Sequence, residues 1–251
     1  QGEFLNSALL IRYKLRKGKN RIRELRNALK KIGVSSKTRR DMIYDTLNPH
    51  QVEDDLSEIL ESISSQTEEI IVDISAMTKL LILVCLCALK EFTGAVKIVY
   101  SEPRNYTPQK KEYEKNKNKM GMIAKYPSQG VSSIIRMKCL SSIRMQGQPV
   151  TLIAFTSFNE QLVRHMLGTI SPHKLILING RPPRKDYHWR ELATQNIHKG
   201  LIEEYSADNL IKDGLLTRVA STLDYRETID RIKEIYKALG LYERIICAAT
   251  G

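Results

Sequence analysis

Short apolar runs alternate along the chain with segments whose apolar residues recur at helical spacing. The runs predict buried strands, and the spaced segments predict amphipathic helices. The predicted strands are Ser7–Lys14, Ile70–Ile74, Ala95–Tyr100, Ser132–Met137, Pro149–Thr156, His173–Asn179, Leu215–Ser221 and Arg244–Ala249. The predicted helices are Asn20–Ile32, Pro49–Ser64, Lys79–Lys90, Asn159–Leu167, Tyr187–Tyr205 and Asp224–Leu239. Val34–Asn48 follows neither pattern and receives no assignment.

The order of these elements indicates the fold class. Strands that alternate with helices from end to end are typical of a mainly parallel sheet with helices on both faces, so we expect an α/β, Rossmann-like fold. Residues 104–130 are rich in Lys, Asn and Gln and lack apolar periodicity, which predicts an exposed basic insertion. It separates a first α/β half, residues 5–103, from a second half, residues 131–251. The second half ends where a further helix is expected, which predicts truncation at its C-terminus.

The stretch from residue 68 to residue 91 is the most informative. Ile70–Ile74 reads as a buried strand leading Asp73 and Ser75 into a turn, and the helix that begins near Lys79 is apolar on nearly every side. Such a helix should pack deeply against a sheet. A strand that brings Asp and Ser to a helix N-terminus is a typical place to bind an anion or a nucleotide.

Ligands of open α/β sheets bind beyond the carboxyl ends of the strands. Hydroxyl and helix N–H groups there suit phosphate or ribose, and Lys79 and Arg181 would add positive charge. The candidate ligand-binding residues are Asp73, Ser75, Thr78, Lys79, Gly180, Arg181 and Thr250. A purely structural explanation stays open for some of them. Ser75 or Thr78 can cap the following helix, and Asp73 can bond to its own turn, while Gly180 can serve only as a turn residue.

The charge of the chain supports a second hypothesis. The chain carries 40 Lys and Arg against 28 Asp and Glu, a net charge of +12 that favours polyanionic partners. The basic residues are dense in Arg12–Arg40, Lys110–Lys119 and Arg181–Arg190, and these segments could bind DNA or RNA directly. The alternative is that the cations are simply solvated and that Trp189 anchors its helix in the core.

Motifs for catalysis and metal binding are missing from the sequence. It contains no GxGxxG, Walker, HExxH or GxSxG motif, so catalytic residues and cofactors receive no assignment. A hydrolase or transferase acting on a nucleotide is a third hypothesis, with Asp73 or Glu102 as base or metal ligand. The four cysteines lack CxxC spacing and the five histidines are scattered, so no zinc site is expected.

The apolar runs also bear on location. No secretory signal pattern is present, and the longest apolar run, Leu80–Leu89, is too short to span a bilayer. We therefore expect a cytoplasmic protein without a membrane partner. Whether it forms a homodimer stays open.

The turn Val72–Lys79, VDISAMTK, resembles the strand–turn–helix of CRISPR-associated Rossmann-fold (CARF) sensor domains. In that family a turn rich in Asp, Ser and Thr contacts a cyclic oligonucleotide. The last three residues of this sequence, Ala249–Gly251, resemble a second such loop. Ala76–Met77 stands where the family has Gly-Gly. Tyr100–Pro103 and Gly180–Pro183 are similar to segments of poorly characterised prokaryotic α/β proteins. The resemblance implies a prokaryotic, defence-associated protein. The leading hypothesis is a Rossmann-like sensor or binding domain for a nucleotide or another phosphorylated ligand.

Overall fold

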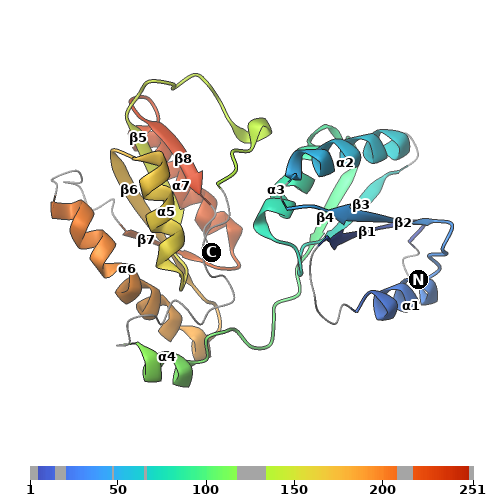
Figure 1. The fold of residues 1–251 in the computed structure, drawn as a ribbon, viewed down its shortest axis with the longest axis horizontal. Helices are drawn as coiled ribbons and strands as arrows, with labels where there is room; N and C mark the ends of the chain where they lie inside the picture. Colours follow the sequence, from blue (N-terminus) through green and yellow to red (C-terminus); the bar gives the residue numbers. More distant parts are fainter. Residues whose placement is uncertain are drawn as a thin grey trace. The chain divides into compact units, whose positions relative to one another are not determined.

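The computed structural model describes residues 5–14, 21–46, 48–64, 67–117, 134–207 and 217–248. The chain divides into two compact units, Gln1–Glu102 and Pro103–Gly251. Helices alternate with strands in both units, and all the strand pairs of the described residues run parallel (Figure 1). The predicted α/β fold class is therefore confirmed.

The first unit contains two parallel strand pairs, β1–β2 and β3–β4. Its elements are β1 (Ala8–Tyr13), α1 (Ile22–Lys31), β2 (Arg39–Tyr44), α2 (Pro49–Ser64), β3 (Glu69–Asp73), α3 (Lys79–Ala88), a short 3-10 turn (Leu89–Glu91) and β4 (Ala95–Val99). Alternation along β2 buries Met42 and Tyr44 and leaves Ile43 exposed.

The core of this unit lies among α2, α3 and β2. Val52 and Leu56 are one helical turn apart on α2 and are buried, as are Leu81 and Val84 on α3. Burying a Leu or Val side chain contributes roughly 1.5–3 kcal/mol, so this seam stabilises the unit. The prediction that this apolar helix packs deeply was too strong, because Leu86 of α3 is 42% exposed.

The second unit holds a four-stranded parallel sheet in the order β7-β6-β5-β8. Its elements are α4 (Lys110–Asn116), a 3-10 turn (Lys138–Leu140), β5 (Val150–Phe155), α5 (Glu160–Ile170), β6 (Lys174–Arg181), a 3-10 turn (Lys185–Tyr187), α6 (Trp189–Ala207), β7 (Thr217–Ser221), α7 (Tyr225–Leu239) and β8 (Arg244–Ala248). The chain steps outward from β5 to β7 and then returns to place β8 on the other side of β5. This reversal is the topological switch of doubly wound folds.

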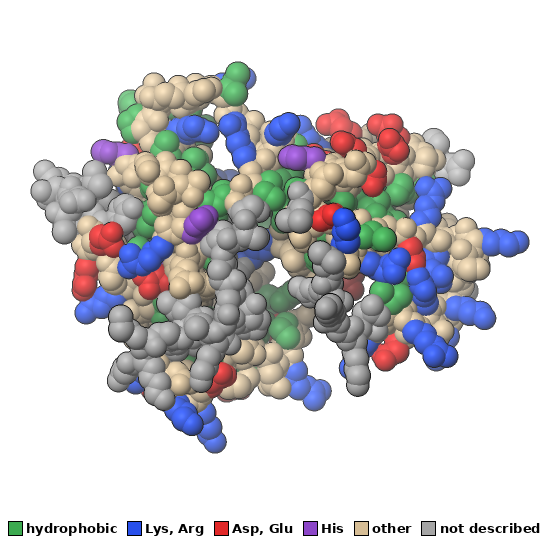
Figure 2. All heavy atoms as spheres, viewed as in Figure 1, with side chains coloured by type: hydrophobic (Ala, Val, Ile, Leu, Met, Phe, Trp, Pro, Cys, Tyr) green, Lys and Arg blue, Asp and Glu red, His purple; other side chains and the backbone are tan. Residues whose placement is uncertain are grey.

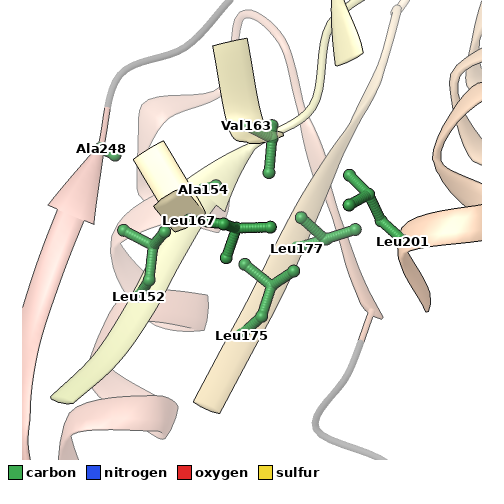
Figure 3. Packing of buried hydrophobic residues seen from close by; sticks show 8 residues of the cluster. All are labelled: Leu152, Ala154, Val163, Leu167, Leu175, Leu177, Leu201 and Ala248. Atoms are coloured by element: carbon green, nitrogen blue, oxygen red, sulfur yellow. The ribbon is translucent and has the colours of Figure 1, made fainter. Parts of the chain in front are cut away.

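Period-two alternation gives this sheet two apolar faces. Leu152 and Leu177 face α5 and α6, where they contact Val163 and Leu201 (Figure 3). Ile153 belongs to the opposite face, in a second cluster that includes three further isoleucines and Ala220: Ile176, Ile178 and Ile235 of α7. Helices therefore cover both faces of this sheet, as the near-continuous apolar strands predicted.

Three segments differ from the sequence predictions. The unassigned Val34–Asn48 contains β2, whose charged first half hid its strand pattern. Ser132–Met137 was predicted as a strand, but its described part, residues 134–137, forms none. The expected exposed insertion, residues 104–130, is described only to residue 117, and that part contains α4 with Tyr113 buried.

Candidate functional site

Each unit presents a carboxyl strand edge, and the predicted site residues are divided between them. Asp73, Ser75, Thr78 and Lys79 belong to the first unit, and Gly180 and Arg181 belong to the second. Thr250 lies outside the described residues.

Asp73 and Ser75 organise the turn after β3. The Asp73 Oδ1 accepts hydrogen bonds from the Ser75 amide at 2.9 Å and from the Ser75 hydroxyl at 2.5 Å. The Ser75 Oγ in turn accepts from the amide of Ser101 at 2.7 Å, just beyond β4. These bonds tie the ends of β3 and β4 together. The structural explanation for Asp73 is thus confirmed, and Ser75 holds the two strand ends in place.

Thr78 is the N-cap of α3. Its side chain accepts from the Leu81 amide at 3.4 Å, while its own amide donates to the Tyr13 hydroxyl at 2.6 Å. Tyr13 packs edge-to-face on Tyr44, with ring centroids 5.4 Å apart. Burial and the neighbouring Tyr13 raise the pKa of Tyr44, so this fully buried phenol stays protonated. The sequence did not single out either tyrosine. β1 and β2 both end in a tyrosine, and this shared position was the sequence feature that could have identified the pair.

Lys79 begins α3 and differs from its neighbours. It makes no ion pair within the described part of the chain, and the residue as a whole is exposed although its ammonium is partly desolvated. Desolvation of the ammonium lowers the pKa of Lys79 to about 8. A cation at a helix N-terminus is also disfavoured by the positive end of the helix dipole. An anion beside Lys79 would relieve both effects, because it would neutralise the ammonium and accept from the exposed helix end.

Asn179 is the centre of a buried polar network at the carboxyl edge of the second unit. Its Oδ1 accepts hydrogen bonds from the hydroxyls of Thr156 and Thr194, and its Nδ2 donates to the carbonyl of Glu191 at 2.9 Å. The side chain is fully buried. The network joins the end of β5 to β6 and α6, beside the topological switch. Its polar groups are already hydrogen-bonded to each other, so they are not available to a ligand at this edge.

Gly180 and Arg181 are explained by contacts within the second unit. A Cβ on Gly180 would lie 2.8 Å from Cγ2 of Thr222, so the close approach of Thr222 requires glycine there. Arg181 donates to both carboxylate oxygens of Glu227, at 2.9 and 3.0 Å. Glu227 also accepts from the Ser221 amide. Arg181 was predicted as a free cation for a ligand, but a carboxylate already neutralises it.

The basic segment Arg181–Arg190 forms internal contacts as well. Arg190 lies 4.3 Å from the ring centroid of Phe158 and donates to the carbonyls of Thr107 and Pro108. Arg184 donates to the carbonyl of Arg104 at 3.1 Å. Trp189 packs in an aromatic cluster with Phe158 and Tyr113: the ring centroids lie 5.9 and 5.4 Å from that of Trp189. The anchoring role of Trp189 is confirmed, while Arg184 and Arg190 hold residues 104–108 instead of standing free in solvent.

His198 is buried on α6 rather than placed at either edge. Its Nδ1 lies 2.9 Å from the carbonyl oxygen of Thr194, and desolvation lowers its pKa. A neutral, fully buried imidazole suits packing better than acid–base chemistry on a ligand.

Comparisons with known proteins add no relative. No family model matches the chain, and searches of curated proteins and of solved structures found no match. Among the described residues, no helix combines the length and the apolar character needed to cross a membrane.

Proposed function

We propose that the chain is a binding or sensor domain for a nucleotide or another phosphorylated ligand, and that Lys79 contacts the phosphate. One observation carries the proposal: an exposed lysine that forms no ion pair with any described residue stands at the N-terminus of α3, in the turn region beyond the carboxyl end of β3. Open α/β sheets bind phosphates at this position. The resemblance of Val72–Lys79 to CARF sensor turns agrees with it.

The surrounding contacts support a preorganised turn. Asp73, Ser75 and Ser101 hold the backbone through hydrogen bonds, and Thr78 caps the helix, so Lys79 projects from a restrained loop. Preorganisation reduces the entropy that binding must overcome. Asp73 already accepts two hydrogen bonds, which favours a positioning role over that of a catalytic base or metal ligand.

Calorimetric titration with a panel of mono-, di- and cyclic nucleotides tests the proposal. A phosphate that contacts Lys79 should bind best when the amine is protonated, and affinity should fall as the pH rises through about 8. Lys79→Met should weaken binding about tenfold and remove this pH dependence. Lys90→Met, which removes an exposed lysine just past α3, is the matched control. The proposal fails if wild-type protein binds none of the nucleotides, or if Lys79→Met binds them as the control does.

A further inference from the structure

Three arginines converge on one aspartate in the first unit. Arg12 lies on β1, Arg26 on α1 and Arg39 on β2, next but one to Asp41. Arg26 bonds to Asp41 Oδ2, and the Nε atoms of Arg12 and Arg39 lie 3.9 and 3.7 Å from the carboxylate oxygens. Among the residues that the structure describes, a single carboxylate therefore balances three guanidinium groups, which leaves an excess of two positive charges.

The donors of this cluster are not satisfied. The Nε atoms of Arg12, Arg26 and Arg39 are all buried, and none has a hydrogen-bond partner within the described residues. A buried donor without an acceptor costs about 1–3 kcal/mol. The guanidinium groups are still reachable, because the side chains of Arg12 and Arg26 are each 38% exposed. The cluster thus combines excess positive charge, unused donors and access from solvent.

The cluster occupies a face of its own. Adjacent residues of a strand point to opposite sides, so Arg12 faces away from Tyr13 and the turn that contains Lys79. In the parallel pair of β1 and β2, Leu10 lies opposite Asp41 and Arg12 lies opposite Ile43. Arg12 and Asp41 therefore lie on the same face of this strand pair. The cluster is therefore independent of the phosphate contact proposed for Lys79.

The surroundings are also basic. Between residues 21 and 41 the chain carries eight Lys and Arg and only two acidic residues. A shallow hollow on α1 is lined by Asn27, Lys30 and Lys31. Figure 2 shows Lys and Arg side chains gathered over the region of α1. A charge field of this kind attracts polyanions over a wider area than a single bound ion requires.

We propose that Arg12, Arg26 and Arg39 form a binding site for a phosphate group of a nucleic acid strand. Guanidinium groups match the geometry of phosphate oxygens and donate to them in pairs. The excess of two positive charges suits a terminal phosphate dianion, and the basic surface of α1 suits the neighbouring backbone. A phosphate would reach the cluster through the exposed parts of the Arg12 and Arg26 side chains.

Fluorescence anisotropy with a short single-stranded DNA labelled at its 3′ end tests the proposal. Arg12→Gln and Arg39→Gln should each weaken binding about tenfold and lower the slope of log affinity against log salt by about one. Arg226→Gln removes the same charge from an exposed position on α7 and should have little effect. Tighter binding of a 5′-phosphorylated strand than of a 5′-hydroxyl strand assigns the site to the terminal phosphate, and equal binding assigns it to the backbone. Binding of AMP, measured by calorimetry, with no binding of the labelled DNA would overturn the nucleic-acid assignment.

Asp41→Asn gives a measurement in the opposite direction. It removes the competing carboxylate, so the variant should bind DNA more tightly than wild type, and thermal melting with circular dichroism confirms that it is folded. A cluster with only a structural role would make all these variants less stable without changing DNA affinity. The proposal is wrong if wild type does not bind, or if the Arg12 and Arg39 variants bind as Arg226→Gln does.

Discussion

Replacing Asn179 tests whether the buried network at the β5–β6 edge serves structure. Asn179→Leu keeps the number and branching of the side-chain heavy atoms and removes the three hydrogen bonds to Thr156, Thr194 and Glu191. Each such bond contributes about 1 kcal/mol net, so we expect a loss of roughly 3 kcal/mol in the free energy of unfolding. That loss would be a large fraction of the stability of an ordinary domain.

Urea unfolding followed by tryptophan fluorescence measures this loss. Trp189 is the only tryptophan of the chain and lies on α6, the helix that the network fixes, so its signal reports on the second unit. The control is the triple variant Asn179→Leu, Thr156→Val, Thr194→Val. Both hydroxyls also donate to backbone carbonyls, Thr156 to that of Ile178 and Thr194 to those of Arg190 and Glu191, so the triple variant should be less stable than Asn179→Leu. A stability of Asn179→Leu within about 0.5 kcal/mol of wild type would refute the reasoning.

Three further predictions concern packing and protonation. Gly180→Ala should lower the free energy of unfolding by about 1 kcal/mol or more, because the new Cβ would contact the Thr222 methyl group. Adding Thr222→Ser removes that methyl group and should restore stability in the same urea assay. Burial lowers the pKa of His198 in the folded chain, so the unfolded chain binds the proton first as the pH falls. The free energy of unfolding should therefore decrease below about pH 6.5. His198→Leu should make the urea midpoint less dependent on pH in that range. Arg190→Ala removes the hydrogen bonds to the carbonyls of Thr107 and Pro108, so residues 104–108 should become more accessible. Trypsin should then cut after Arg104 faster than it does in the control Lys199→Ala, which changes an exposed residue of the same helix.

The pattern of apolar residues was sufficient to predict most elements of the fold. The continuous apolar runs of β5 and β6, and the helical spacing along α2 and α7, are local properties, and a chain must bury such apolar surface against another layer. β2 escaped because Arg39, Arg40 and Asp41 interrupt its apolar pattern. The predicted helix Asn20–Ile32 forms as α1, but Leu25 on it is 47% exposed while Arg26 bonds to Asp41.

The candidate site was only partly visible in the sequence. Turn chemistry identified Asp73, Ser75, Thr78 and Lys79, because these residues lie within one short stretch and act on each other or on the helix that follows. The sequence could not show that Arg181 is neutralised by Glu227, which is 46 residues further along the chain. Ion pairs of that kind depend on which strands and helices become neighbours.

The sequence by itself therefore determined most of the strands and helices, and that these form parallel α/β layers. Only the tertiary structure decided the strand order β7-β6-β5-β8 and which cations remain available to a ligand. Periodicity is encoded within a few consecutive residues, whereas the balance of charge around a side chain is set by residues from distant parts of the chain. The arginines around Asp41 show this most clearly, since β1, α1 and β2 each supply one of them and only the fold brings the three together.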